Sequence, residues 1–552
     1  MAFSNCHQHV NGVSNSHYDA IVIGAGMSGI RMLHDLKKRG IDGKCFEAGS
    51  GIGGTWYWNR YPGARADSES WVYILTFLEE IGMDYKWKER FPTQPELERY
   101  LNEVVDYLKL RDNFVLNTRI GSAHYDDSKN IWHVTTSKGE KHTCDFLITA
   151  AGPLSTPLKP PFRGLDSFKG EYYQTALWPD KKVDFTGKRV GIFGTGATGV
   201  QLVPLIAHAA KKLTVFQRTP NYVLPGRNFV FSEGQERELK QDFNGIAKRV
   251  RAQPFGGDMG STTRTFLNVK DKEALNQAFD YGWEQGGFRY IFETVNDMLT
   301  NVDCNEAASE FLRKKIRALV HDPVTAETLC PYYPLMSKRP PLGHFYYEAF
   351  NRPNVELVDI KKDPVEEITP TGLRTLAREF ELDIIIFAIG FDAVTGTLDS
   401  IDIRGNKGKP LKAHLESNLA TAYGITTAGF PNLFMVLGPQ SVWANLPVVI
   451  DNTVDWIGKT MSHMRESGHK RIDTKTELTE KWKEEVDKQF WGTLLGQGAR
   501  ATGAWHVGGN VEGKPLRCYW YFGGVPAYIE HCDQEIESGY PGFIFSNPIE
   551  AH

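Results

Sequence analysis

Two glycine-rich turns in the sequence have the spacing that binds a dinucleotide. Each has the pattern Gly-x-Gly-x-x-Gly, follows a short apolar strand and opens a helix. In this pattern the first glycine allows a tight bend, the second lets the backbone approach a pyrophosphate, and the third lets the helix pack on the strand. The free N–H groups at the helix start attract the phosphates. The glycines are Gly24, Gly26 and Gly29 in the first turn, and Gly194, Gly196 and Gly199 in the second.

The residue after the next strand differs between the two turns. Glu47 follows the first turn, and a carboxylate at that position accepts hydrogen bonds from ribose hydroxyls. Arg218, followed by Thr219, stands at the matching position of the second turn, where a guanidinium pairs with a 2′-phosphate that a carboxylate would repel. The simplest assignment is FAD at the first turn and NADP at the second. The alternative for Arg218 is a solvated surface charge.

The elements that must position these residues form two βαβ units. The first has a strand at residues 18–23, a helix that ends near Arg39 and a second strand that ends at Glu47. Residues 93–96 resemble a capping box that opens a helix. A long stretch after the second unit is helical and charged. These features predict an α/β fold with two Rossmann-type dinucleotide-binding domains and a helical insertion.

The order of these elements assigns each part of the chain to a domain. We expect a mobile tail at residues 1–17, and an apolar run near residue 385 that forms a buried parallel strand. The expected FAD-binding domain is 18–153 with 390–552, the NADP-binding domain is 154–223 with 336–389, and the helical insertion is 224–335.

Composition excludes several classes of protein. A chain of 552 residues suits two or three domains, and its net charge of −4 gives no basic footprint for nucleic acid. No apolar run approaches the roughly 20 residues that span a bilayer. The seven cysteines form no C-x-x-C pair, and the histidines lack metal-ligand spacing. We therefore expect a cytoplasmic protein without membrane, nucleic-acid or metal partners, as a monomer or weak oligomer.

Five further segments carry longer motifs. Residues 53–67 read GGTWYWNRYPGARAD, and residues 168–179 read FKGEYYQTALWP. Residues 337–339 are Ser-Lys-Arg, residues 388–392 read AIGFD, and residues 505–514 read WHVGGNVEGK. With these motifs the chain resembles the Baeyer–Villiger monooxygenases, close to the cyclohexanone and phenylacetone enzymes, over nearly its whole length.

The resemblance implies roles for individual residues. Arg339 would face the flavin with Asp67 as its charge partner, Lys338 would contact NADP, and the loop that begins at Trp505 would fold over NADP. The further cofactor-binding positions that it implies are Thr55, Trp56, Tyr61, Asp67 and Thr219, and its candidates for the ketone pocket are Trp443 and Leu446. The structural alternatives are an ion pair at a domain junction for Arg339, a turn cap for Asp67, and ordinary packing for both tryptophans.

The sequence departs from the family pattern at two positions. Gln174 stands where the second motif usually has histidine, and Ile389 stands where threonine is usual. Glutamine forms hydrogen bonds but does not titrate, so a role that needs imidazole charge is absent here. We therefore do not count Gln174 as catalytic.

The resemblance also implies a reaction. NADPH reduces FAD, the reduced flavin takes up O2 as a C4a-peroxyflavin, and the peroxide attacks a ketone to give an ester or lactone. The reaction forms two successive anions, the peroxide and the tetrahedral adduct with the ketone. Arg339 suits both because its guanidinium stays charged. The nearest alternative is a flavin-dependent N- or S-oxygenating monooxygenase. More distant alternatives are a reductase without oxygenation and a non-catalytic NADPH sensor.

Overall fold

The first sheet carries the first glycine turn. The computed structural model describes residues 16–269 and 271–547, so most of the expected tail lies outside the described residues, and Ser16 and His17 belong to the first strand. The strand order is β17-β4-β5-β6-β1-β2-β3, and β18 also pairs with β6. The strands are β1 (Ser16–Ile23), β2 (Gly43–Phe46), β3 (Phe114–Val115), β4 (Ile120–Asp126), β5 (Ile131–Thr136), β6 (Lys141–Thr149), β17 (Asp402–Arg404) and β18 (Leu433–Met435).

The second sheet carries the second glycine turn. Its order is β12-β9-β8-β16-β7, and every pairing in it is parallel. The strands are β7 (Glu171–Gln174), β8 (Arg189–Phe193), β9 (Lys212–Gln217), β12 (Val355–Asp359) and β16 (Ile384–Phe387). β16 is buried along its whole length between β7 and β8, as the apolar run near residue 385 predicted.

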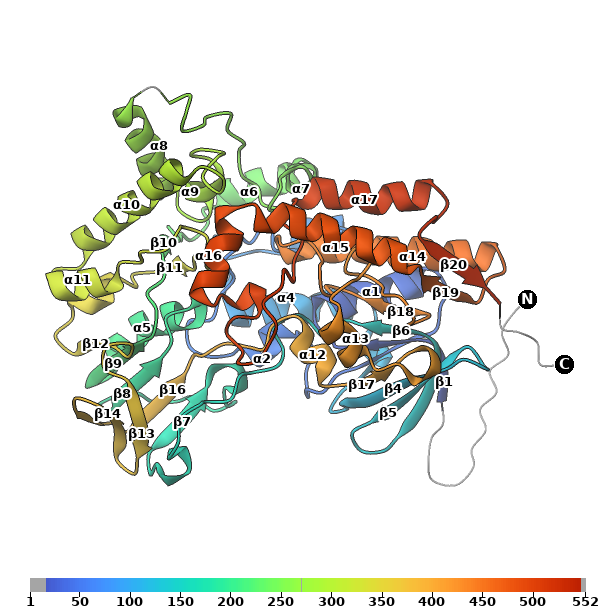
Figure 1. Ribbon diagram of the computed structural model, residues 1–552, viewed down its shortest axis with the longest axis horizontal. Helices are drawn as coiled ribbons and strands as arrows, with labels where there is room; N and C mark the ends of the chain where they lie inside the picture. The colour runs from blue at the N-terminus through green and yellow to red at the C-terminus, as the bar shows by residue number, and fades with distance from the viewer. Residues whose placement is uncertain (1–15, 270, 548–552) are drawn as a thin grey trace.

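Both sheets have the predicted strand–turn–helix geometry. α1 (Met27–Lys38) follows β1, and α5 (Ala197–Ala209) follows β8. The two sheets lie beside each other in the lower half of Figure 1. The pairing of β17 with β4 and of β18 with β6 returns the chain to the first sheet after the second is complete. The α/β fold class is confirmed, while the exact domain boundaries stay a prediction.

Helices cover the region between and above the sheets. The group α8–α11 forms the upper left of Figure 1, and α14, α15 and α17 run above the first sheet. Besides α5, the helices between β2 and β12 are α2 (Thr55–Trp58), α3 (Glu79–Asp84), α4 (Gln94–Tyr107), α6 (Glu233–Gln241), α7 (Phe243–Ala252), α8 (Lys272–Gln285), α9 (Arg289–Phe292), α10 (Val302–Leu319) and α11 (Pro323–Leu329). The later helices are α12 (Thr395–Asp399), α13 (Leu411–Ser417), α14 (Leu446–Glu466), α15 (Thr476–Trp491), α16 (Leu494–Thr502) and α17 (Val525–Glu537).

Two strand pairs and one three-stranded sheet complete the structure. The helical segment is framed by the short parallel pair β10 (Leu224–Pro225) and β11 (Leu342–Gly343). The remaining strands are β13 (Val365–Thr369), β14 (Gly372–Thr375), β15 (Glu379–Glu381), β19 (Arg471–Thr474) and β20 (Phe543–Ser546). A search of the described helices finds none with the length and apolar character needed to cross a bilayer.

The predicted capping box before α4 is wrong. Thr93 precedes the helix, but its side chain makes no capping hydrogen bond. Oε1 of Glu96 instead accepts a hydrogen bond from the backbone N–H of Lys88 at 3.0 Å. A segment packed against the helix from outside has therefore replaced the local partner that the sequence pattern offers.

A buried ion pair joins the helix of the first glycine turn to α14. The Arg31 side chain on α1 is 5 % exposed, and its Nε donates to Oδ1 of Asp451, which is 2 % exposed, at 2.9 Å. Oδ2 of Asp451 accepts from the Thr76 hydroxyl at 2.8 Å. Burial raises the pKa of Asp451, and the charge of Arg31 opposes this rise. The pair anchors the start of α14, which follows Trp443, to the helix of the first glycine turn.

Removing the cation of this pair should destabilise the protein. Arg31→Met leaves the Asp451 carboxylate buried without a cation, which costs about 3–5 kcal/mol. The matched control is Arg39→Met, because Arg39 is partly exposed and its partner Asp35 keeps Arg31 as a neighbour. We expect the control to lose about 1 kcal/mol or less. Thermal and urea unfolding of both variants measure the difference, and equal losses would contradict the assignment.

Candidate functional site

The first glycine turn is shaped by backbone contacts that no other residue allows. Gly24 has φ +108°, and a Cβ added there would lie 2.6 Å from the Ala150 carbonyl oxygen. A Cβ on Gly29 would lie 2.0 Å from the Gly24 carbonyl oxygen, so the helix packs directly on the turn. These contacts are the ones that the glycine spacing predicted.

Glu47 braces this turn as well as facing it. Its buried carboxylate accepts hydrogen bonds from the N–H groups of Ala25 at 2.9 Å and Gly49 at 2.7 Å. An ionised carboxylate has about four lone-pair sites, so two such bonds leave acceptor capacity for ribose hydroxyls. The residue therefore fits a dinucleotide and fixes the loop around it.

The second turn has the same geometry with an open centre. Gly194 has φ +109°, and a Cβ there would lie 2.3 Å from the Ala388 carbonyl oxygen. A Cβ on Gly196 would meet no atom within 4 Å, so this backbone faces open space at the start of α5. The Thr195 hydroxyl donates to the Thr219 carbonyl oxygen at 2.9 Å and ties the end of β9 to the turn. The open backbone at a helix start fits a pyrophosphate.

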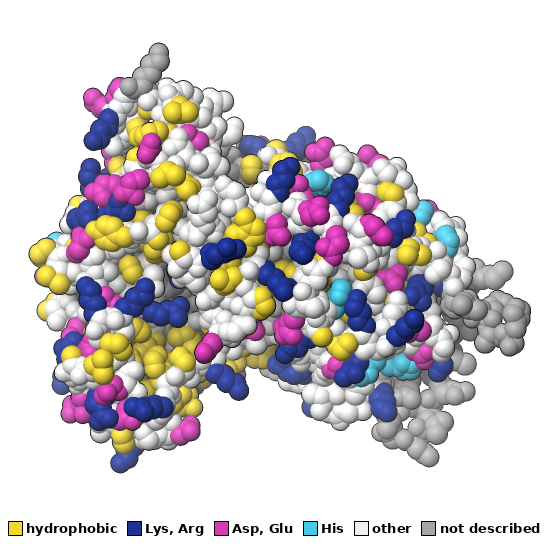
Figure 2. Space-filling model, viewed as in Figure 1, with side chains coloured by type: hydrophobic (Ala, Val, Ile, Leu, Met, Phe, Trp, Pro, Cys, Tyr) yellow, Lys and Arg dark blue, Asp and Glu magenta, His cyan; other side chains and the backbone are white. Residues whose placement is uncertain are grey.

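A group of cations without carboxylate partners stands beside this turn. Within the described part of the chain, neither Arg218 nor Lys338 forms an ion pair. Burial, and then the charges of Arg218 and Lys361, lower the pKa of Lys338 to about 8. Figure 2 shows Lys and Arg side chains gathered on the left of the visible face, over the region of α5. Cations that repel one another without compensation fit a bound anion such as a 2′-phosphate.

The residues predicted for catalysis meet in an ion pair. Nη1 of Arg339 donates to Oδ2 of Asp67 at 2.7 Å, with the side chains 24 % and 11 % exposed. Oδ1 of Asp67 is buried without a hydrogen-bond partner among the described residues. The Asp67 loop is held by backbone bonds from Ala66 to Pro92 at 3.0 Å and from Ser70 to Arg90 at 2.7 Å. Since Asp67 uses one corner of the guanidinium, the rest of that group remains available to an anion.

Glu69 is a residue of this region that the sequence analysis missed. Its Oε1 accepts from Arg90 at 3.0 Å and from Arg289 of α9 at 2.6 Å. Burial raises the pKa of Glu69, but the charges of Arg289 and Arg90 outweigh burial and hold it below its ordinary value. An acid two positions after Asp67, just beyond the end of the long motif, was the available signal. Glu69 ties the Asp67 loop to the helical segment.

The other residues of the first motif lie between the two turns. Thr55 is exposed at the start of α2, and Trp56 is buried with its ring edge-on to Tyr73. The Tyr61 hydroxyl donates to Oε1 of Gln201 on α5 at 2.8 Å. The motif therefore reaches from the first turn to the helix of the second.

The two predicted tryptophans are joined by a residue that was not predicted. The ring centroid of Trp443 lies 6.2 Å from that of His506, and Trp505 lies 5.7 Å from the same imidazole. Trp443 also packs against Phe522, with ring centroids 4.9 Å apart. Leu446 opens α14 three residues after Trp443 and is half-buried. His506 has no motif signal of its own beyond its place next to Trp505.

Gln174 makes a backbone contact at the end of its strand. It ends β7, and its Nε2 donates to the carbonyl oxygen of Leu158. This bond holds the strand against the segment that crosses from the first sheet. The position outside the Arg339–Asp67 pair agrees with a side chain that does not titrate.

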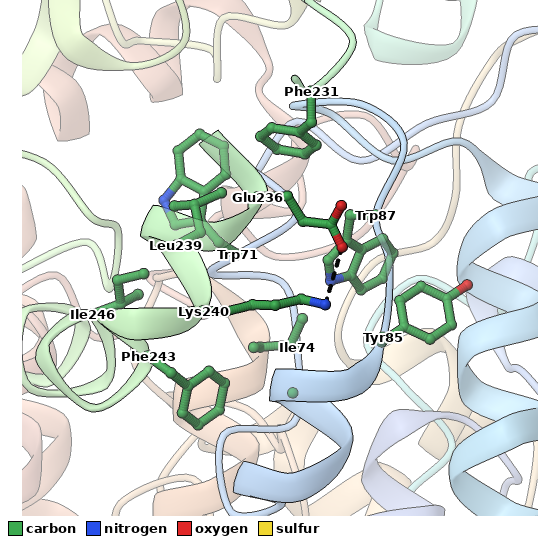
Figure 3. A pocket seen from close by; sticks show the side chains of 11 residues that line it. Trp71, Ile74, Tyr85, Trp87, Phe231, Glu236, Leu239, Lys240, Phe243 and Ile246 are labelled. Atoms are coloured by element: carbon green, nitrogen blue, oxygen red, sulfur yellow. Dashed lines mark ion pairs between the residues drawn. The ribbon is translucent and has the colours of Figure 1, made fainter. Parts of the chain in front are cut away.

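A separate apolar cavity of about 30 Å³ lies between α6–α7 and the segment around Trp71. Figure 3 shows aromatic side chains around it and the ion pair of Glu236 with Lys240, whose atoms are 3.0 Å apart. This volume holds about one or two water molecules. None of the predicted site residues lines it.

Two dinucleotide turns on two sheets, with an arginine–aspartate pair that joins residues 67 and 339, define a two-dinucleotide α/β protein. The family model described as flavin-binding monooxygenase-like matches residues 18–242. The chain is 39 % identical to a phenazine N-monooxygenase of Lysobacter antibioticus, over 96 % of this chain and 97 % of the relative. It is 38 % identical to a Baeyer–Villiger monooxygenase of Pseudooceanicola batsensis, over 97 % of each.

A solved structure extends the similarity to three dimensions. The cyclohexanone monooxygenase from Rhodococcus sp. Phi1 bound to NADP⁺ matches with a TM-score of 0.94 and 39 % identity, covering 97 % of this chain and 100 % of that one. The chain belongs to the Baeyer–Villiger monooxygenase family of flavin-binding monooxygenases. The family resemblance seen in the motifs is confirmed.

The two glycines of the second turn should respond differently to alanine. Gly194→Ala drives a Cβ into the Ala388 carbonyl at a positive φ, so we expect poor folding. Gly196→Ala meets no protein atom, so the fold should survive while NADP⁺ affinity falls by about tenfold or more, since the added methyl occupies the approach of the pyrophosphate. Circular dichroism and NADP⁺ titration test this. Undiminished NADP⁺ binding by Gly196→Ala would contradict it.

NADP⁺ affinity should depend on pH through Lys338. With a pKa near 8, Lys338 is charged below that pH and loses its charge as pH rises through it, so its attraction for a 2′-phosphate is present at about pH 7 and fades by about pH 9.5. A bound anion raises the pKa of Lys338, so the affinity for NADP⁺ falls gradually as pH rises. Isothermal titration across this range measures the effect. Lys338→Met should bind more weakly and show a flatter profile, and an unchanged profile would contradict the assignment.

Proposed function

We propose that the protein is an FAD- and NADPH-dependent monooxygenase that inserts one atom of O2 beside the carbonyl of a ketone and releases an ester or lactone. FAD would be held by the first turn and Glu47, and NADPH by the second turn, Arg218 and Lys338. Bound FAD, once reduced by NADPH, supplies the activated oxygen. The single observation that carries the proposal is the Arg339–Asp67 pair in a chain with two different dinucleotide turns.

Arg339 has the properties that the reaction requires. Attack on a ketone carbonyl places negative charge on oxygen, and a preorganised donor that stays charged stabilises it. Asp67 would orient the guanidinium and balance its charge from one side only. Glu69, gripped by Arg90 and Arg289, would keep the Asp67 loop in place.

The ketone would bind on the aromatic side of the site. Trp443 and Leu446 stand at the start of α14, and Trp505 stands on the glycine-rich segment that would cover NADP. Aromatic rings bury the apolar body of a ketone, and the carbonyl would point toward the cationic side. We further propose a cytoplasmic protein that is a monomer or weak oligomer. The seven scattered cysteines, which form no C-x-x-C pair, support the location, and light scattering tests the assembly.

N-oxygenation is a second candidate because one relative is a phenazine N-monooxygenase at 39 % identity. A panel of cyclic, aryl and linear ketones run beside phenazines and tertiary amines separates the two. Ester or lactone formation, followed by gas chromatography, supports the main proposal. N-oxide formation without any ester would replace it with the second.

Arg339→Ala should abolish ester formation while the protein keeps its FAD. Loss of one preorganised donor costs about 3–4 kcal/mol, or roughly 10²–10³ in rate. NADPH oxidation should fall less, and hydrogen peroxide should appear in place of ester. Asp67→Ala should give a milder form of the same defect. The control is Arg249→Ala, an exposed arginine that pairs with Asp242 and Asp258.

Stopped-flow reduction, a peroxide assay and lactone yield measure these effects. Ester formation by Arg339→Ala at a rate near that of the parent would make Arg339 a purely structural ion-pair residue.

A further inference from the structure

His506 is a buried imidazole that the protein leaves without a partner. The residue is 1 % exposed, and both ring nitrogens lack a hydrogen-bond partner among the described residues. A neutral imidazole has one N–H donor and one acceptor, and burial of either without a partner is unfavourable. Native proteins rarely keep such atoms, so each one needs an explanation.

The imidazole lies where the predicted ketone and NADP sides meet. Its ring centroid is 6.2 Å from Trp443, 6.2 Å from Phe522 and 6.1 Å from Phe490. The charge of Lys338 reaches it as well, because burial and then Lys338 lower the pKa of His506 to about 3. The ring is therefore neutral at working pH, and it is a polar group inside an aromatic shell.

The segments around His506 carry further unpaired polar atoms. On residues 441–445 and 510–520 the buried atoms without hydrogen-bond partners are Ser441 Oγ, Asn445 Oδ1, Asn510 Oδ1 and Trp520 Nε1. The first two flank Trp443, and the Trp520 ring lies 6.3 Å from Trp505. Such atoms also occur elsewhere among the described residues, but those beside Trp443 and Trp505 stand where a ligand with hydrogen-bonding groups would pair with them.

We propose that His506 contacts the substrate and selects ketones that carry a second oxygen atom away from the reacting carbonyl. The inference rests on the proposed function and names the substrate class of the same site. A hydroxyl group is both donor and acceptor, so it pairs with either nitrogen of a neutral imidazole, whichever one faces the substrate. The surrounding rings of Trp443, Phe490 and Phe522 bury the carbon frame of a cyclic ketone. Sites built to pair a polar group discriminate against analogues that lack it.

The test compares two ketones of nearly equal size, 4-hydroxycyclohexanone and 4-methylcyclohexanone. The variants are His506→Phe, which keeps the ring and removes both nitrogens, and His506→Asn, which restores one donor and one acceptor. The control is His463→Phe, because the partly buried His463 on α14 packs against Tyr540 and Phe545 at 5.0 and 5.2 Å. For each protein the ratio of kcat/KM for the hydroxy ketone to that for the methyl ketone is measured, with the Kd of both ketones and the Tm.

We expect the hydroxy-to-methyl ratio to fall about tenfold to a hundredfold in His506→Phe, in kcat/KM and in Kd alike. His506→Asn should recover part of it, and His463→Phe should leave it unchanged. The Tm of His506→Phe should equal or exceed that of the parent, since two unpaired buried atoms are removed. A residue with a purely structural role would lose stability and keep the ratio.

The outcomes separate this inference from the proposed function. A ratio in His506→Phe within about twofold of the parent, with both ketones still oxygenated, overturns the role of His506 and leaves the proposed function standing. A parent protein that oxygenates neither of these two ketones but accepts other ketones of the panel overturns the inference alone, whereas one that oxygenates no ketone of the panel overturns both.

Discussion

The ion pair between Arg339 and Asp67 is the constraint on which the rest of the site depends. Its members come from segments separated by both sheets and the helical segment, and the pair is only partly exposed. It forms only when the loop after the first turn packs against the segment between α11 and β11, which carries Arg339. Glu69 secures this meeting, because its carboxylate binds Arg90 beside the loop and Arg289 from α9.

The two glycine turns show how one backbone geometry serves two ligands. In both, a helix touches the turn so closely that a single added carbon would collide with a carbonyl oxygen. The difference lies in the side chain after the next strand. The Glu47 carboxylate accepts hydrogen bonds from two N–H groups of its own loop. Arg218 is exposed and lies beside Lys338, whose positive charge it repels. Local charge, rather than fold, therefore distinguishes the two turns.

The aromatic side of the site encloses a polar group that has no hydrogen-bond partner among the described residues. Trp443, Trp505 and Phe522 enclose a histidine whose nitrogens the protein does not satisfy. Functional sites often retain groups that reduce stability, because the ligand completes them. The ion pair of Arg31 with Asp451 joins α14, which begins three residues after Trp443, to α1.

The sequence by itself determined the features that depend on neighbouring residues. The glycine spacing, Glu47 and Arg218, and the buried strand β16 all follow from local pattern, because turns and strands are set by short-range sterics and periodicity. The pairing of Arg339 with Asp67 came from motif resemblance, since no local rule joins residues so far apart.

Only the tertiary structure decided which partner each polar side chain meets. Glu96 looked like a capping residue, yet it binds the Lys88 N–H because another segment packs against α4. Glu69 and His506 gave no pattern of their own, because the arginines around one and the unpaired nitrogens of the other arise from long-range packing. Burial and partnership are properties of the assembled chain, and so the chemistry of these residues appears only there.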